Sequence, residues 1–301
     1  MKNAVILVLS SCAMALTTAA YSQTWVSNTG SDTGTCPINA PCKTFAYAVT
    51  KTPSWGQLSV LNAGDYGPVT ITEPIRIDGG GFATNVINSS QGTGISVNTP
   101  SGSVVQLHNL SLHSNYGAGY GIYFNGVGGL DVDNVQLTGF QFGIYAQSSQ
   151  WQNIVVKDTT FENISSTGII VNGTSATSLQ SVVVINSHMR FANFGLTAEY
   201  AAVSILNSTF TSPNAGTTVG NYGNGIQSIN SNLYVDNCQI NGYLEAVYAN
   251  GGITQVNRSA FLNNKYAVVA SPNVISNGSN TTFNNTTLLA DYGAPAAATM
   301  W

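Results

Sequence analysis

Charged residues are scarce in this chain. Only 7% of its 301 residues are Asp, Glu, Lys or Arg, against about 25% in an average soluble domain. The eight Lys and Arg residues are too few to follow a phosphate backbone, which excludes nucleic-acid binding. Charge-driven disorder is excluded as well, because the formal net charge is only -4 and 43% of the residues are hydrophobic.

Long apolar runs are also lacking. After the N-terminus, no segment approaches the ~18 apolar residues of a membrane-spanning helix, so we predict no membrane span. Asn, Ser, Thr and Gln supply the polar side chains that charged residues supply elsewhere. This profile is typical of a rigid, β-rich extracellular protein.

The N-terminus has the pattern of a secretory signal peptide. Lys2 precedes an apolar segment, and Ala20-Tyr21-Ser22 offers small residues on both sides of Tyr21, as a cleavage site requires. We predict residues 1–22 as a Sec-type signal peptide, and a secreted or cell-surface location. The alternative is a lipoprotein anchored at Cys12, because Leu9-Ser10-Ser11-Cys12 resembles a bacterial lipoprotein box.

Export determines how the remaining cysteines are interpreted. Cys36 and Cys42 bracket a short loop with no His or second Cys pair nearby, so we predict a disulfide and no metal site. Cys238 falls at an inward position of the repeat described next. This position predicts a buried, unreactive thiol.

A two-part unit recurs beyond residue 90, with a mean period of about 24 residues. Its first part is a strand that begins Gly-Ile. Its second part is an apolar alternation, a central Asn or Asp, and a second alternation. Copies of the second part span residues 105–112, 130–137 and 154–161, and later copies centre on Asn186, Asn207, Asn237, Arg258 and Asn280.

The apolar residues around the central Asn show that the chain turns there. Leu130 and Val132 precede Asn134 by four and two residues, whereas Val135 and Leu137 follow it by one and three. A strand alternates with a period of two, so one continuous strand cannot place all four on one face. Asn tolerates the left-handed backbone of a tight corner, and stacked Asn side chains can form a ladder. The repeat therefore predicts three short strands per coil, with coils about 4.8 Å apart.

These repeats resemble the right-handed parallel β-helix family, the architecture of pectate lyases, polygalacturonases and phage tailspikes. The resemblance covers residues from about 58 to 283. Residues 24–27, 43–49 and 75–81 look like the opening of secreted bacterial β-helix proteins of mostly unassigned function. We predict an all-β, right-handed parallel β-helix of roughly ten coils in the pectate-lyase-like superfamily.

The limits of the repeat divide the chain into segments. Residues 23–57 are predicted as an N-terminal cap that holds the Cys36–Cys42 loop and a short helix over residues 43–50, whose apolar residues have helical spacing. Residues 58–290 are the β-helix, and residues 291–301 are a tail. A solenoid needs such caps, because its end coils are otherwise exposed.

Catalytic residues are missing where the resemblance implies them. Polysaccharide-cleaving members place acids with Arg or Lys on an exterior sheet face, as two acids for a hydrolase or as Ca²⁺ ligands with a base for a lyase. In the exterior columns of the Gly-Ile strands, Glu199 alone is charged. Glu162, His188 and Arg190 share another exterior face, so a catalytic site would be carried by these three residues or by Glu199. We predict a protein without catalysis, with a polysaccharide lyase or glycoside hydrolase of non-standard site as the alternative.

Other charged residues pair between coils. Asp133 and Lys157 share one column, and Glu162 and Arg190 share another, which predicts exposed ion pairs worth about 0–1 kcal/mol each. The competing interpretation is a Ca²⁺ site at Asp131, Asp133 and Asp158. Such a site needs about six to eight oxygen ligands, and Lys157 opposes a cation there. We therefore predict no metal and no cofactor, with Ca²⁺ as the alternative.

Outward-pointing aromatic residues indicate a ligand. Rings cover the apolar face of a sugar, and amides bond its hydroxyls. We predict a monomeric protein that binds an extracellular glycan. The alternatives are rings that only stabilise adjacent coils, and a structural surface protein or adhesin. The predicted binding residues are Tyr123, Tyr145, Tyr248, Asn125 and Gln147, and four further rings precede the Gly or Ala of their coils: Tyr120, Phe142, Phe194 and Tyr266.

Overall fold

A computed structural model describes residues 22–81, 85–88, 92–115, 117, 119–176, 179–190, 192–212, 223–271, 274–276, 279–285 and 287–290. The predicted signal peptide lies outside the described residues except for Ser22, and so do Cys12 and the predicted C-terminal tail.

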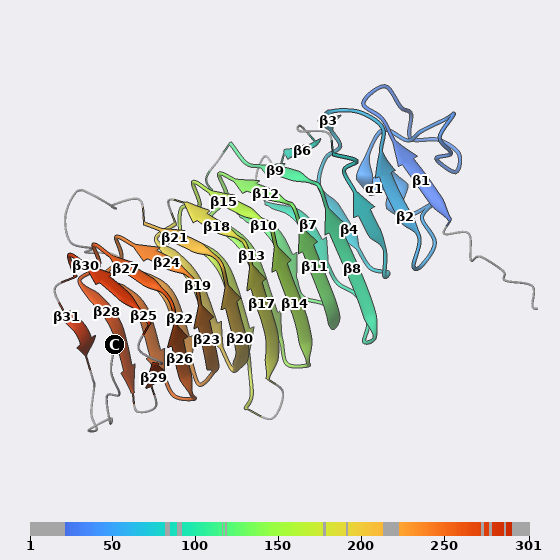
Figure 1. The fold of residues 1–301 in the computed structure, drawn as a ribbon. Helices are drawn as coiled ribbons and strands as arrows, with labels where there is room; N and C mark the ends of the chain where they lie inside the picture. Colours follow the sequence, from blue (N-terminus) through green and yellow to red (C-terminus); the bar gives the residue numbers. More distant parts are fainter. Residues whose placement is uncertain are drawn as a thin grey trace, which may run out of the picture.

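The chain winds into a parallel β-solenoid with three sheets (Figure 1). From β2 onward, successive strands pass through sheets A, B and C in strict rotation, and paired strands are parallel. The predicted all-β parallel solenoid is confirmed.

Sheet A contains β1 (Gln23–Val26), β2 (Gln57–Val60), β5 (Arg76–Asp78), β8 (Ser103–His108), β11 (Gly128–Asp133), β14 (Gln152–Lys157), β17 (Gln180–Ile185), β20 (Ala201–Leu206), β23 (Asn232–Asp236), β26 (Thr254–Asn257) and β29 (Val274–Ser276). Sheet B contains β3 (Gly64–Asp65), β6 (Asn85–Asn88), β9 (Ser111–His113), β12 (Gln136–Thr138), β15 (Thr160–Glu162), β18 (His188–Arg190), β21 (Thr209–Thr211), β24 (Gln239–Asn241), β27 (Ala260–Leu262) and β30 (Thr281–Phe283). Sheet C contains β4 (Val69–Ile71), β7 (Thr93–Val97), β10 (Tyr120–Phe124), β13 (Phe142–Ser148), β16 (Thr167–Gly173), β19 (Phe194–Glu199), β22 (Asn224–Ile229), β25 (Glu245–Asn250), β28 (Tyr266–Ser271) and β31 (Thr287–Ala290).

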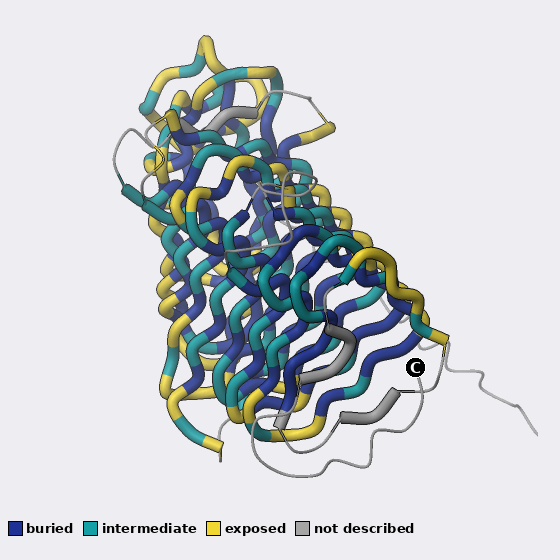
Figure 2. Tube along the Cα trace, turned by 90° about the vertical axis from the view of Figure 1, so that its left-hand side faces the viewer, coloured by how far each residue is buried: buried dark blue, intermediate teal, exposed yellow. Residues whose placement is uncertain are grey.

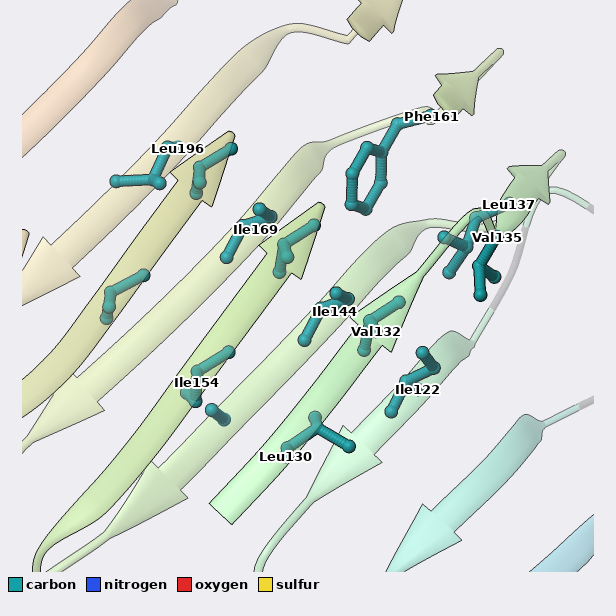
Figure 3. Packing of buried hydrophobic residues seen from close by; sticks show 14 of the residues in the cluster. Ile122, Leu130, Val132, Val135, Leu137, Ile144, Ile154, Phe161, Ile169 and Leu196 are labelled. Atoms are coloured by element: carbon teal, nitrogen blue, oxygen red, sulfur yellow. The ribbon is translucent and has the colours of Figure 1, made fainter. Parts of the chain in front are cut away.

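Apolar side chains from all three sheets fill the interior of the solenoid (Figure 3). Ile122, Ile144 and Ile169 are fully buried and occupy equivalent positions in three adjacent coils of sheet C. Buried and partly exposed residues alternate along each coil (Figure 2). Since every second side chain of a strand points outward, each sheet presents regular exterior columns that run along the solenoid.

The corner between sheets A and B is built as predicted. Asn109, Asn134, Asn207 and Asn237 have positive φ values of 57°, 54°, 51° and 52°. Asn134 Nδ2 donates to Asn109 Oδ1 at 2.8 Å, and Asn109 Nδ2 donates to Asp78 Oδ1 at 2.9 Å. Asn237 Nδ2 donates to Asn207 Oδ1 in the same way, at 2.8 Å. The predicted Asn ladder therefore links neighbouring coils on the outside of this corner.

A second column inside the corner is made of short polar side chains. Ser187 Oγ accepts the N–H of Thr159 at 3.3 Å, and Ser208 Oγ accepts the N–H of Ser187 at 3.1 Å. Cys238 continues this column, with its N–H donating to Ser259 Oγ at 3.1 Å. The Cys238 thiol is buried, as predicted, and burial raises its pKa to about 11.

The last repeat copy is shifted by one residue from the prediction. Arg258 is a corner residue with a φ of 45°, but Asn280 is not. The pairing of Ala260 with Thr281 aligns Asn280 with Ser259, in the inner column. Asn280 Oδ1 accepts the N–H of Ser259 at 2.9 Å, so its amide does there what a hydroxyl does in other coils.

The N-terminal segment closes one end of the solenoid. Strand β1 pairs with β2 in sheet A, and a disulfide joins Cys36 to Cys42. The predicted helix is present as α1 (Phe45–Val49), and Thr44 caps it by accepting the Tyr47 N–H. Phe45 is fully buried in the core, and α1 contacts β1 and β4. Within the part of the chain described, no helix is long and apolar enough to cross a membrane.

Candidate functional site

Four aromatic side chains gather on the exterior of sheet C at strands β10 and β13. Parallel register places Tyr120 beside Phe142, and Tyr123 beside Tyr145. Five pairs of these rings have centroids 5.1 to 5.8 Å apart. We call these four residues the ring cluster.

A break in the strand alternation brings the rings to one face. Tyr120 and Tyr123 are three residues apart, so a regular strand would point them to opposite faces. Instead, Gly121 and Ile122 are both buried, and Tyr120 and Tyr123 are both partly exposed. A Cβ on Gly121 would lie 2.7 Å from the Gly143 carbonyl oxygen and 2.5 Å from Leu137 Cδ2, so only glycine fits this inward position.

The same break recurs one coil later. Phe142 and Tyr145 are partly exposed, with Gly143 and Ile144 buried between them. A Cβ on Gly143 would lie 2.4 Å from the carbonyl oxygen of the next coil and 2.5 Å from the Phe161 ring. The Gly-Ile motif is therefore the local cause of the ring cluster.

The rings of the cluster present both faces and edges. Tyr120 and Phe142 are stacked, with centroids 5.3 Å apart and an interplanar angle of 19°. Tyr145 meets both of them edge-on, at 68° and 74°. Such stacked and edge-to-face arrangements are favourable for aromatic pairs and hold the rings rigid.

Amide side chains border the ring cluster at the end of the strands. Asn172 Nδ2 donates to the Tyr145 hydroxyl at 3.1 Å, and that hydroxyl donates to Gln147 Oε1 at 3.4 Å. Asn125 and Gln147 are exposed on the same face. The structure thus brings together four of the five predicted binding residues: Tyr123, Tyr145, Asn125 and Gln147.

Tyr248 is separate from the ring cluster. It lies in the same exterior column as Tyr145, but Ile170, Thr197 and Gln227 occupy the three coils between them. Four coil intervals of about 4.8 Å place the two tyrosines about 19 Å apart. Tyr248 is partly exposed like its counterpart.

A cleft adjoins the ring cluster on the side of the N-terminal cap. It has a volume of about 350 Å³ and lies between α1 and the exterior of sheet C. Ser96 and Thr93 line it and pair in register with Tyr123 and Tyr120, so the cleft continues directly into the rings. No sequence pattern predicts this cleft, because it depends on how α1 packs against strands distant in the chain. Its lining includes Val49, Thr50, Thr70, Glu73, Thr93 and Ser96.

The catalytic candidates lie on two sheets, with Glu162, His188 and Arg190 on the exterior face of sheet B. Glu162 and Arg190 are register neighbours on sheet B and line a shallow pocket of about 440 Å³. The predicted ion pair between them is wrong, because none of the ion pairs among the described residues joins these two side chains. His188 Nδ1 is instead 2.8 Å from Thr209 Oγ1. Glu199 lies on another sheet, beside Asn172 in sheet C.

The predicted ion pair between Asp133 and Lys157 on sheet A is present. Lys157 Nζ lies 3.4 Å from Asp133 Oδ2 and 3.9 Å from Asp158 Oδ2. Asp131 Oδ2 lies 3.6 Å from His108 Nε2. This contact and several weaker ones lower the pKa of Asp131 and outweigh the effect of burial, which raises it. No group of three or more acidic, His or Cys side chains in the described ranges is placed to hold a metal ion.

The functional assignment therefore depends on the geometry of the exterior sheets. The ring cluster and the adjoining cleft together cover strands β4, β7, β10 and β13 of sheet C. Comparisons of the chain with models of known protein families and with curated proteins found no match.

Proposed function

We propose that this chain is a secreted β-helix protein of the pectate-lyase-like superfamily that binds extracellular carbohydrate on the exterior of sheet C without cleaving it. The observation that carries the proposal is the ring cluster with its border of exposed amides. Rings cover the C–H face of a sugar, and amides donate to and accept from its hydroxyls. The N-terminal pattern of residues 1–22 and the Cys36–Cys42 disulfide support an extracellular location.

The ligand is proposed to lie along the solenoid axis. The cleft spans β4 and β7, and the ring cluster continues over β10 and β13. Three coil intervals of about 4.8 Å make this surface about 14 Å long, enough for a short oligosaccharide. Hydroxyls of Thr70, Thr93 and Ser96 line its cleft end, and amides line its ring end.

The proposed glycan is neutral. Apart from tyrosine, Glu73 is the only ionisable side chain among the lining of the cleft and the ring cluster. A polyuronide would bring a carboxylate to every sugar and meet no Lys or Arg there. Its desolvated carboxylates would remain unpaired, which disfavours acidic polysaccharides.

We propose binding without turnover because, among the described residues, the candidate acid and base side chains do not lie beside the ring cluster. Glycoside hydrolysis uses two carboxyl groups about 5 to 9.5 Å apart. Glu162 and Arg190 are on sheet B, and Glu199 is two coils beyond Tyr145. A bound sugar on the ring cluster therefore meets no pair of carboxyl groups.

A glycan array combined with a turnover assay tests the proposal. The mature protein is applied to neutral and acidic polysaccharides, with reducing ends and ultraviolet absorbance followed with and without Ca²⁺. We expect saturable binding to a neutral glycan, no product, and loss of binding in Tyr145→Ala. Product formation that disappears in Arg190→Ala or Glu199→Gln would instead identify an enzyme. Absence of binding to every glycan would leave a structural surface protein or adhesin.

A further inference from the structure

A second pocket lies on sheet A, on a different sheet from the ring cluster. It has a volume of about 460 Å³ and is formed at the start of strands β2, β5 and β8. Its lining combines an indole, a guanidinium, two primary amides and aliphatic side chains, which come from Trp55, Gly56, Gln57, Ile75, Arg76, Val104 and Gln106.

Trp55 is displayed outward in an unusual backbone conformation. Its φ is 63°, a left-handed value that bulky residues rarely adopt. The Trp55 N–H donates to the Pro74 carbonyl and the Gly56 N–H donates to the Pro53 carbonyl, so the turn is held on both sides. The side chain is 54% exposed. The indole therefore contributes little to the core, and the turn places Trp55 in the lining of the pocket.

The guanidinium of Arg76 has hydrogen-bonding capacity left over. One terminal nitrogen is 2.8 Å from Asp78 Oδ2, and this contact fixes the side chain. Arg76 Nε is covered by surrounding atoms but has no hydrogen-bond acceptor. Covered donors are nearly always paired in folded proteins, so an unpaired one calls for an acceptor. A hydroxyl oxygen of a ligand in the pocket would supply it after a small shift of the side chain.

The two amides add donors and acceptors at the spacing of the coils. Gln57 and Gln106 both flank Arg76 in register, one coil before it and one coil after it. Gln106 Nε2 is 3.5 Å from Asp131 Oδ2, at the limit of a hydrogen bond. Arg76 is the one charged side chain of the pocket lining, and Asp78 balances its charge.

We infer that this pocket is a second saccharide-binding site, for one or two residues of a neutral sugar stacked on Trp55. The Trp55 indole covers the apolar sugar face, and Arg76, Gln57 and Gln106 bond its hydroxyls. A carboxylate-bearing sugar is disfavoured, because Asp78 already neutralises the only cation of the pocket. The site is independent of the ring cluster and stands whether or not sheet C binds a glycan.

The chain contains a matched control for this inference. Trp151 is 53% exposed, nearly the same as Trp55; it directly precedes β14 of sheet A, as Trp55 shortly precedes β2. It is four coils away and does not line the pocket. A ligand specific to the pocket must distinguish these two indoles.

Indole N–H resonances measured by NMR on the mature ¹⁵N-labelled protein test the inference. Neutral gluco-, xylo- and manno-oligosaccharides are titrated to about 10 mM, which reaches millimolar affinities, with oligogalacturonate as the acidic comparison. We expect a saturable shift of the Trp55 resonance, identified by its loss in Trp55→Phe, and no shift of the Trp151 resonance. Gln106→Ala should weaken the binding at least about tenfold, with the other indole resonances unchanged as a check of folding.

The Tyr145→Ala variant separates this site from sheet C. The Trp55 shift should persist in that variant, even where glycan binding to the ring cluster is lost or was never present. The inference is overturned if no neutral sugar shifts the Trp55 resonance, if Trp151 shifts equally, or if oligogalacturonate binds more tightly than every neutral sugar.

Discussion

Substitution of Asn134 measures what one corner residue contributes to the solenoid. Its φ of 54° is unfavourable for an L-residue other than Asn, Asp or Gly, and Asn134→Ala should lose about 1 kcal/mol on this account. The same change removes the 2.8 Å bond from Nδ2 to Asn109 Oδ1. This bond is exposed, so its contribution is at the lower end of the usual range, about 0.5 kcal/mol. The total is about 1–2 kcal/mol.

A thermal melt followed by circular dichroism measures this loss, and a second variant divides it. At about 2–4 °C per kcal/mol for a domain of this size, Asn134→Ala should lower Tm by about 2–8 °C. Asn134→Gly loses the same hydrogen bond but tolerates positive φ, so it should lie between wild type and Asn134→Ala. An unchanged Tm in Asn134→Ala, or a Gly variant less stable than the Ala variant, would refute the corner and ladder reasoning.

Three other changes test separate parts of the structure. Gly143→Ala should lower stability by about 1–3 kcal/mol through overpacking, measured by urea unfolding. A wild-type midpoint would contradict the close contacts that an added Cβ would make with the next coil and with Phe161. Reduction of the Cys36–Cys42 bond should lower Tm, because the broken cross-link frees a loop of the unfolded chain; finding both thiols free in protein purified without reductant would contradict this prediction. The contact with His108 is the largest of those that lower the pKa of Asp131 in the folded state. The stability that ionised Asp131 contributes is therefore present above its unfolded pKa near 4 and is lost as pH falls through its folded pKa. Asp131→Asn should therefore reduce the acid sensitivity of unfolding below about pH 4, and identical pH profiles would argue against this contact.

The solenoid could be predicted because each coil repeats a local signal. The apolar parity around Asn134 requires a corner, and the same reasoning applies at Asn109, Asn207 and Asn237. The repeat pattern predicts Asn280 as a corner residue, one position away from its place in the inner column, because Asn suits both the corner and that column of hydroxyl acceptors. Sequence pattern alone does not distinguish these two uses of an amide.

The candidate sites were predictable only in part. The outward direction of Tyr123 and Tyr145 follows from strand alternation, but the approach of Tyr120 depends on the break in alternation at Gly121. The cleft beside the rings depends on contacts between α1 and sheet C, which no local pattern contains. Trp55 lies before the repeat begins, so periodicity gave no reason to consider it.

We propose that the ring cluster binds a neutral glycan and that an isolated exterior tyrosine such as Tyr248 does not. Titration calorimetry with the neutral oligosaccharide selected on the array tests it most directly, using Tyr145→Ala and the matched variant Tyr248→Ala. Tyr145→Ala should weaken binding at least about tenfold, since it removes one ring and the contacts of that ring with the other three. Tyr248→Ala should bind like wild type, because it lies about 19 Å away along the same column. Equal effects of the two substitutions, or no effect of Tyr145→Ala, would contradict the assignment of glycan binding to the ring cluster.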